Sequence, residues 1–255
     1  MTNFFVALQF LTVLRPRQDF AEDGAAVARS QAWFPAIGLL LGVGLLAIDR
    51  AASRALPDAS VDVLLVVALA VLTGALHLDG LADAADGLLG GRTPGQRLEI
   101  MRDVHAGTYA IVAVVSVLAL KWAGLVALPS NVRVETLVLT PCLARSAMLV
   151  TIAAFPYARA DGMGTSFRER AWPFALLAGG ATALAASVVL LGAGGLYVVV
   201  FAGVCALVLG AYARRLTGGV TGDVYGATVE ISEAAIFLFI AAMANRGWLD
   251  ALAFG

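Results

Sequence analysis

Three aspartates between His77 and Gly107 carry the clearest chemical signal in this chain. Asp79, Asp83 and Asp86 are spaced four and three residues apart, so a helix would place their carboxylates within roughly 60° of one another. Carboxylates stacked in this way repel one another unless a cation lies among them. We therefore predict that they bind a divalent metal ion, and their hard oxygen donors favour Mg²⁺.

The residues that follow predict a helical hairpin. Gly90 and Gly91 can end the aspartate-bearing helix, and Thr93-Pro94-Gly95-Gln96 has the residues of an N-cap, a first helical position and a capping box. A second helix starting here would dock against the first and form a pocket of mixed charge. We assign Arg102 and Asp103 to this pocket as catalytic residues; the alternative is a solvated hairpin held by weak surface ion pairs.

A glycine-rich stretch further along adds more acids. Gly222 stands where backbone could approach a ligand closely, and Asp223 beside it is a further candidate metal ligand. Glu230 and Glu233 lie at the start of an apolar run, where ionisable groups are costly and are functional candidates by default. We predict that both glutamates contact substrate; the alternative is that they snorkel to the membrane surface.

Two arginines fit an anionic substrate. Arg145 lies inside an apolar run and Arg159 follows that run. A guanidinium matches phosphate oxygens bidentately, so the two could hold a pyrophosphate that metal-bound carboxylates approach from the other side. For Arg145 a structural ion pair with Asp79 or Glu233 is an equally good interpretation.

Two histidines, His77 and His105, flank the acidic hairpin. Hard oxygen ligands suit Mg²⁺ better than imidazole does, so we interpret both as hydrogen-bonding residues rather than metal ligands. We include them among the candidate substrate-binding residues.

The composition places these residues in a membrane protein. Hydrophobic residues make up 60% of the chain and charged residues 14%, whereas an average soluble domain is about one-quarter charged. The net charge of −1 and the dispersed basic residues argue against a nucleic-acid partner. Cys142 and Cys205 both lie in apolar runs, with neither disulfide nor zinc spacing.

Apolar runs of about 20 residues predict an all-α, polytopic integral membrane protein of about seven transmembrane helices. The first dozen residues are too short to span and predict an N-terminal helix at the membrane interface, and the absence of a long polar linker predicts one domain over 1–255. Placing the N-terminus in the cytoplasm leaves only Arg50, Arg54, Arg133 and Arg246 outside. Three loops, 79–106, 156–171 and 214–231, then face the cytoplasm with the candidate site. The predicted spans are 34–49, 61–78, 107–128, 134–155, 172–192, 194–213 and 232–249.

Four separated motifs resemble the cobalamin synthase family, also called adenosylcobinamide-GDP ribazoletransferase. They are HLDGLADAADGLLGG, EIMRD with Gly107, PYAR-x-x-GMG and GGVTGDVYGATVEISE, in this order, and the opening FFVALQFLTVL is similar too. The resemblance implies a Mg²⁺-dependent enzyme of a bacterial or archaeal cytoplasmic membrane. It would join adenosylcobinamide-GDP to α-ribazole or its 5′-phosphate and release GMP. In MRDVHAGTYA, His105 and Ala110 stand where many relatives have a basic residue and a glycine, which leaves the role of position 105 open.

The implied reaction assigns roles to the candidate residues. Mg²⁺ would bridge the diphosphate, arginines would hold its oxygens, and an acid would take up a proton or hold a water molecule. The proposed metal ligands are Asp79, Asp83, Asp86 and Asp223; the phosphate-holding residues are Arg102, Arg145 and Arg159; the candidate acids are Asp103 and Glu230.

Two other functions are compatible with the sequence. Asp79-Gly80 begins like the motif of membrane CDP-alcohol phosphotransferases, although the later spacing of that motif is not kept. A cation-coupled transporter would also use intramembrane acids, but it should hold them near the bilayer midplane rather than at cytoplasmic ends. The partners expected are the two substrates and the lipid bilayer. A homo-oligomer, or association with other cobamide-assembly enzymes, is left open.

Overall fold

A computed structural model describes residues 2–14, 24–159 and 174–249. These residues are helical, apart from loops and one isolated parallel bridge between Tyr157 and Val220. The described helices are α1 (Thr2–Leu11), α2 (Gly24–Ser30), η1 (Gln31–Trp33), α3 (Phe34–Ala52), α4 (Asp58–Leu72), α5 (Leu76–Gly90), α6 (Pro94–Ile100), α7 (Thr108–Val126), η2 (Ser130–Val132), α8 (Arg133–Ala154), α10 (Ala175–Leu191), α11 (Gly194–Thr217) and α12 (Gly222–Asn245).

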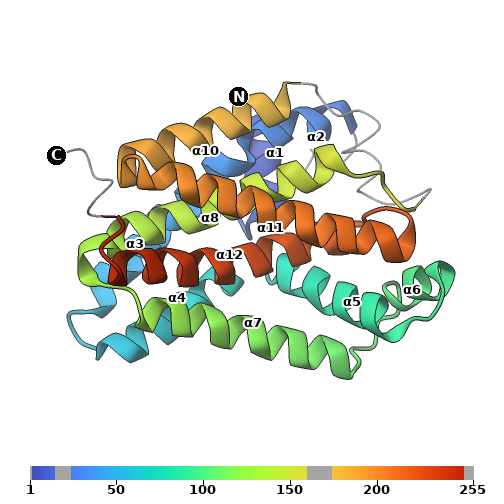
Figure 1. The fold of residues 1–255 in the computed structure, drawn as a ribbon, viewed down its shortest axis with the longest axis horizontal. Helices are drawn as coiled ribbons and strands as arrows, with labels where there is room; N and C mark the ends of the chain where they lie inside the picture. The colour runs from blue at the N-terminus through green and yellow to red at the C-terminus, as the bar shows by residue number, and fades with distance from the viewer. Residues whose placement is uncertain (1, 15–23, 160–173, 250–255) are drawn as a thin grey trace.

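The helices form a bundle with α8 and α12 at its centre (Figure 1). Within 18-residue apolar stretches, 72% of α8 and 67% of α12 are buried inside the protein, against 28% for α7 and α11. The outer helices therefore present most of their apolar side chains outward. A surface of this kind is expected to contact lipid.

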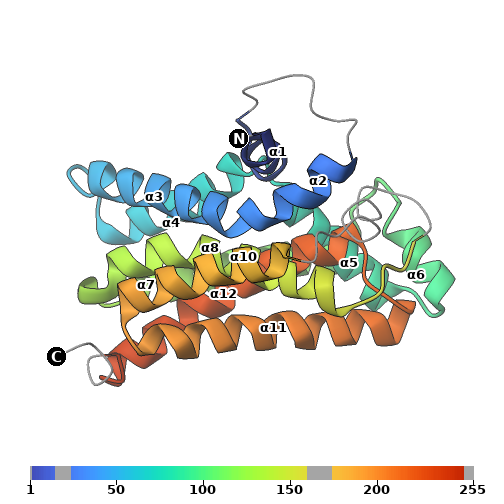
Figure 2. The ribbon, with the colours of Figure 1, turned by 90° about the horizontal axis from the view of Figure 1, so that it is seen from above.

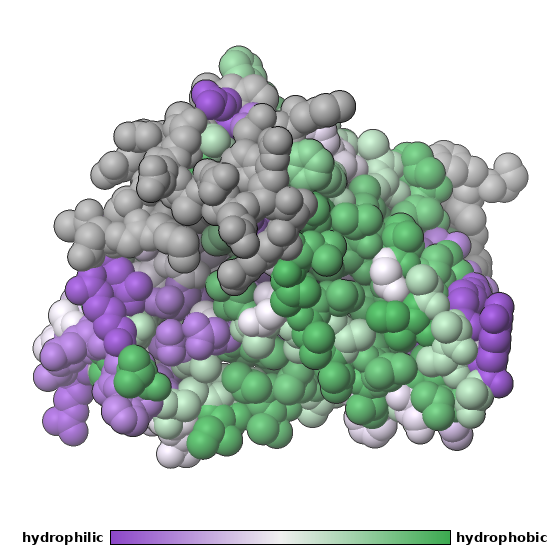
Figure 3. All heavy atoms as spheres, turned by 180° about the vertical axis from the view of Figure 1, so that it is seen from behind, coloured by the Kyte–Doolittle hydropathy of each residue, from purple (hydrophilic) through white to green (hydrophobic). Residues whose placement is uncertain are grey.

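The polytopic, all-α prediction is confirmed for the described residues. By length and composition five helical segments can cross a membrane, or six if α4 and α5 form one broken span. The predicted span 172–192 corresponds to the shorter helix α10, and its first two residues lie outside the described residues. Figure 3 shows hydrophobic residues over the middle of one face of the molecule and hydrophilic residues at its two ends. This banding is typical of a membrane protein.

The predicted span 61–78 is interrupted in the structure. α4 ends at Leu72 and α5 begins at Leu76, with a bend of 88° between the two helices. Gly74 and Ala75 both have left-handed backbone conformations, with φ of 60° and 56°, which end a right-handed helix. The turn directs α5 alongside α12, and so determines where the aspartates lie.

The N-terminal segment is a helix, as predicted. Figure 2 shows α1 end-on, whereas α11 runs across the picture, so α1 crosses the direction of the bundle. Such an orientation suits a helix lying in the membrane interface. The interfacial location itself stays a prediction.

Candidate active site

Two glycines bring the acidic residues of α5 and α12 together. A Cβ atom on Gly80 would lie 3.0 Å from the carbonyl oxygen of Asp223 and 3.1 Å from Cα of Gly226. A Cβ atom on Gly226 would lie 3.0 Å from the carbonyl oxygen of His77. The two helices thus touch through their backbones, as membrane helices do at small residues.

This packing corrects the interpretation of the glycine-rich stretch. The predicted loop 214–231 is mostly helical, because α11 continues to Thr217 and α12 begins at Gly222. Gly226 packs against α5 and also lines the cavity described below, and Gly218 ends α11 with a φ of 81°. Gly222 has open space around it, so its predicted contact with substrate remains available.

Asp79, Asp83 and Asp223 form what we call the aspartate cluster. The pKa of the Asp83 carboxyl, beyond the end of the predicted span, is raised to about 6. Burial is the largest cause, followed by the negative charges of Asp79 and Asp223, while Arg159 acts in the opposite direction. Carboxylates from two distant parts of the chain therefore share one electrostatic environment, as the sequence predicted.

Among the described residues, Arg159 is the cation that contacts this cluster. Its Nη2 donates to Oδ2 of Asp223 at 2.8 Å, and the Thr221 hydroxyl donates to the same oxygen at 3.1 Å. The Nε atom of Arg159 is buried and has no hydrogen-bond partner among the described residues. The described residues therefore leave this buried donor unsatisfied. The rest of the PYAR-x-x-GMG motif lies outside the described residues.

Asp86 is engaged in a different way from the other aspartates. Its Oδ2 accepts a hydrogen bond from the Gly107 amide at 2.5 Å and its Oδ1 accepts one from the Ala110 amide at 2.9 Å. These amides stand at the start of α7, where N–H groups lack intrahelical partners. Asp86 therefore fastens the beginning of α7 to α5, and its predicted metal contact would have to compete with these bonds.

The hairpin prediction is confirmed in its helices. α5 ends at Gly90 and α6 begins at Pro94, with the Thr93 hydroxyl accepting from the Gln96 amide at 3.3 Å. The Gln96 side chain accepts from the amide of Arg92 rather than from that of Thr93, which is one residue displaced from the expected capping box.

Arg102, Asp103 and His105 lie on the exposed segment between α6 and α7. The Asp103 carboxylate contacts Nδ1 of His105 at 2.7 Å, and hydrogen bonds from His105 lower the pKa of Asp103. Asp103 is not among the charges that perturb Asp83. The structure therefore pairs two of these candidates with each other rather than placing them in the aspartate cluster.

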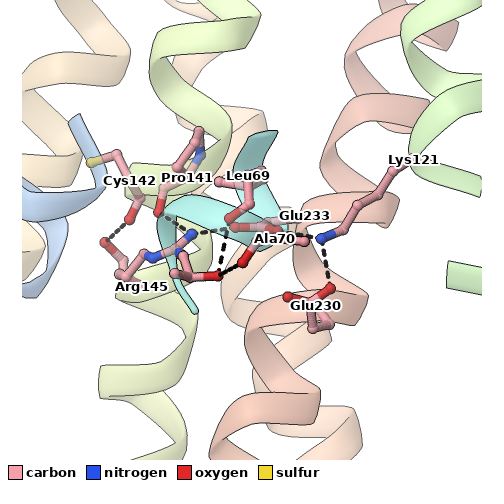
Figure 4. Close-up of polar contacts among 10 residues, drawn as sticks. Leu69, Ala70, Lys121, Pro141, Cys142, Arg145, Glu230 and Glu233 are labelled. Carbon is pink, nitrogen blue, oxygen red and sulfur yellow. Dashed lines mark hydrogen bonds and ion pairs between the residues drawn. The ribbon is translucent and has the colours of Figure 1, made fainter. Parts of the chain in front are cut away.

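Glu230, Glu233, Lys121 and Arg145 form a second group, the buried ion network (Figure 4). The Lys121 ammonium donates to Glu230 at 2.7 Å and to Glu233 at 2.5 Å. The other carboxylate oxygen of Glu233 accepts from Arg145. All four side chains are at most 4% exposed.

The buried ion network decides between the two interpretations of Arg145. Arg145 pairs with Glu233, which lies ten residues beyond Asp223 on α12. Ten residues correspond to about 15 Å along a helix axis. Arg145 and Arg159 are therefore not brought together as a pair. The glutamates do not snorkel to the surface either. Lys121 was not among the predicted site residues, and its signal was a single lysine inside an apolar run.

A cavity of about 190 Å³ lies beside the aspartate cluster. α1, α5, α8 and α12 all contribute to its wall, and Asp79 and Asp223 are among the lining residues. His77 also lines it and is 2% exposed, with no hydrogen-bond partner on either ring nitrogen among the described residues.

The structure contains a third charged group that the sequence analysis missed. Arg133, at the start of α8, bonds Asp49 at 2.8 Å and Asp62 at 2.7 Å. The aspartate cluster lies near the other end of α8, about 33 Å away for a helix of 22 residues. The sequence signal for this group was the presence of an acid inside each of two apolar runs, Asp49 in 34–49 and Asp62 in 61–78. This group joins α3, α4 and α8 and is remote from the candidate site.

The three carboxylates of the aspartate cluster could hold a metal ion after local side-chain adjustment. As the side chains lie, the described residues include no group of three or more His, Cys, Asp or Glu side chains close enough to bind one. The donor set is nevertheless oxygen-only, which suits Mg²⁺. The negative charges of Asp79 and Asp223 both raise the pKa of Asp83, and a cation would relieve this repulsion. The metal assignment stays a prediction.

Comparison with known proteins identifies relatives over almost the whole chain. The family model described as cobalamin-5-phosphate synthase matches residues 3–241. A Desulfitobacterium hafniense protein named adenosylcobinamide-GDP ribazoletransferase is 37% identical over 93% of this chain and 96% of its own length. Proteins of the same name from Stutzerimonas stutzeri and Pseudomonas fluorescens are 37% and 38% identical, covering 96% and 94% of this chain and 100% and 99% of their own lengths. No solved structure matches the chain significantly.

Proposed function

The chain belongs to the cobalamin-5-phosphate synthase family, and from this membership we propose that it is an adenosylcobinamide-GDP ribazoletransferase. It would transfer the adenosylcobinamide-phosphate group from adenosylcobinamide-GDP to α-ribazole or its 5′-phosphate, releasing GMP. The observation that supports the proposal best is the aspartate cluster, in which acids of α5 and α12 meet beside Arg159. Cleavage of a diphosphate develops negative charge on its oxygens, which a metal ion held by carboxylates and a neighbouring arginine can stabilise.

The aspartate cluster would hold the metal ion of the reaction. Carboxylate oxygens would come from Asp79, Asp83 and Asp223, on two helices that pack backbone to backbone at Gly80 and Gly226. When bound, Mg²⁺ would supply positive charge that offsets the negative charge developing on the phosphate oxygens as the diphosphate is cleaved. Arg159 would turn its guanidinium from Asp223 toward the phosphate oxygens, and would bring to them the buried Nε donor that has no partner among the described residues.

The reaction itself is a substitution at phosphorus. The acceptor 5′-oxygen forms a bond to the phosphorus nearer cobinamide, and the bond from that phosphorus to the bridging oxygen breaks. The bridging oxygen leaves with its electron pair as part of GMP. With a free 5′-hydroxyl, the proton passes to a carboxylate of the cluster, and Asp79 is the exposed member.

The buried ion network would act by positioning rather than by touching substrate. The charges of this network neutralise one another inside the bundle: Lys121 pairs with Glu230 and Glu233, and Arg145 pairs with Glu233. They join α7, α8 and α12 and so maintain the helix that carries Asp223. Asp86 likewise maintains the packing of α5 on α7.

Replacing Asp83 by asparagine tests the proposal. The purified, folded variant should lose about 10² or more in turnover at saturating Mg²⁺, because a metal ligand and a charge are removed. GMP release from adenosylcobinamide-GDP is the measurement, with chelation by EDTA and restoration by Mg²⁺ as the metal control. Wild-type turnover in Asp83→Asn would refute the assignment, and CMP release from a CDP-alcohol would support the other transferase class.

A further inference from the structure

Two segments that are far apart in the sequence meet through their backbones beside the aspartate cluster. The amide of Val220 donates to the carbonyl oxygen of Pro156 at 2.8 Å, and the amide of Ala158 donates to the carbonyl oxygen of Val220 at 2.8 Å. These two hydrogen bonds form the parallel bridge between Tyr157 and Val220. The bridge joins the segment after α8 to the segment between α11 and α12, and Arg159 follows it directly.

Gly219 allows the two backbones to approach this closely. A Cβ atom at this position would overlap the carbonyl oxygen of Pro156 and would lie 2.9 Å from the amide nitrogen of Ala158. Both of these are backbone atoms, so no side-chain rotation could make room for the added carbon. With any larger residue at this position, the segment that carries Arg159 would have to move away from the start of α12.

Thr217 holds the peptide group that makes the bridge. It is 6% exposed, and its hydroxyl donates to the carbonyl oxygens of Gly219 at 2.7 Å and Ala213 at 2.8 Å. The Gly219 carbonyl belongs to the same planar peptide unit as the amide of Val220, which donates to Pro156. Both polar atoms of this peptide unit are therefore engaged, and its orientation is fixed.

The bridge restricts where the Arg159 side chain can lie. Arg159 is the next residue after Ala158, and its Nη2 donates to Oδ2 of Asp223 at 2.8 Å. The side chain of Arg159 is 12% exposed. A guanidinium on a fixed backbone has only side-chain freedom to lose when it binds an anion, which lowers the entropic cost of positioning it.

We propose that Gly219 and Thr217 are positioning residues, which act through the bridge to keep the Arg159 guanidinium beside Asp223, within reach of a substrate phosphate. The inference rests on the proposed function for the identity of that substrate. Neither positioning residue needs to touch the substrate. Their effect on the reaction therefore passes through Arg159.

A double-mutant cycle on GMP release tests this route. Gly219→Ala should lower kcat/KM for adenosylcobinamide-GDP about 10-fold or more, because the guanidinium is displaced. In the Arg159→Ala background, where the guanidinium is already absent, Gly219→Ala should lower kcat/KM by no more than about 2-fold. An equal loss in both backgrounds would show general damage to the site and would overturn the proposal.

Chemical modification of Arg159 tests its placement without any turnover. Phenylglyoxal reacts with accessible guanidinium groups, and peptide mass spectrometry identifies each modified arginine. Arg159 should react about 10-fold faster in Gly219→Ala than in the wild-type protein, because the segment opens locally, whereas the exposed Arg92 should keep its rate. An unchanged rate at Arg159 in the folded variant would overturn the inference. If the wild-type protein releases no GMP, the proposed function fails and this measurement still decides the inference.

Thr217→Val is the second variant, and it keeps the proposal testable if Gly219→Ala does not fold. Valine has a similar shape and lacks the hydroxyl, so the Gly219 carbonyl loses its partner. The variant should show both effects at smaller size, and wild-type behaviour in both measurements would overturn the role of Thr217. Gly95→Ala is the matched control, because Gly95 is exposed and a Cβ atom there meets nothing within 4 Å. It should leave kcat/KM and the modification rate of Arg159 unchanged.

Discussion

Removing the charge of Lys121 should destabilise the protein more than most single substitutions do. The buried ion network contains two cations, Lys121 and Arg145, and two anions, Glu230 and Glu233, so its formal charge is zero. Lys121→Met keeps the length of the side chain and removes the ammonium, which leaves two buried carboxylates with one arginine. A buried ion pair broken from one side typically costs about 3–5 kcal/mol in free energy of unfolding.

The double variant Lys121→Met/Glu230→Gln distinguishes electrostatics from lost packing. It restores zero formal charge, because Arg145 and Glu233 remain paired. Its free energy of unfolding should therefore exceed that of Lys121→Met, although a second residue has been changed. Additive packing losses would instead make the double variant less stable than either single variant.

Unfolding by SDS in mixed micelles, followed by circular dichroism, measures these free energies. Arg54→Met is the control, since Arg54 lies at an exposed position and the substitution should change stability by no more than about 0.5 kcal/mol. Wild-type unfolding of Lys121→Met, or no recovery of stability when Glu230→Gln is added to it, would refute the electrostatic role of Lys121.

Three further predictions concern the contacts around the site. Gly226→Ala places a Cβ atom 3.0 Å from the backbone of α5, so it should separate α5 from α12 and lower the rate of GMP release about 10-fold or more. Gly203→Ala is the control: its Cβ atom meets nothing within 4 Å, and GMP release should be unchanged. Asp86→Asn should lower the free energy of unfolding by about 1–2 kcal/mol while keeping more activity than Asp83→Asn; equal losses of activity in the two variants would argue that Asp86 is also a metal ligand. Arg133→Met leaves two buried aspartates without their cation and should lower stability by about 3–5 kcal/mol, with kcat of the folded enzyme retained; a fall in kcat would show coupling between the two ends of the bundle.

The helical membrane character and the hairpin could be predicted from sequence because they depend on local signals. Apolar run length predicts spans, and glycine, proline and threonine at fixed offsets predict the end of α5 and the start of α6. The bend at 73–75 was missed, because Ala75 in a left-handed conformation breaks no composition rule that a single sequence displays.

The candidate site was predictable as a set of residues and not as an arrangement. The spacing of Asp79 and Asp83 and the polarity around Asp223 identified the acids. Which acids meet was decided by the 88° turn before α5 and by the contact of Gly80 with Gly226. The same packing places Asp86 where it accepts hydrogen bonds from the amides at the start of α7.

The sequence by itself determined that this chain is an apolar helical protein with acids and arginines beside its spans, because hydrophobicity, helix punctuation and charge are properties of neighbouring residues. Only the tertiary structure decided that Arg145 and Glu233 neutralise each other in the interior while Arg159 and Asp223 remain beside the cavity. The physical reason is that a charge takes its role from the partners and solvent around it, and those depend on which helices pack together.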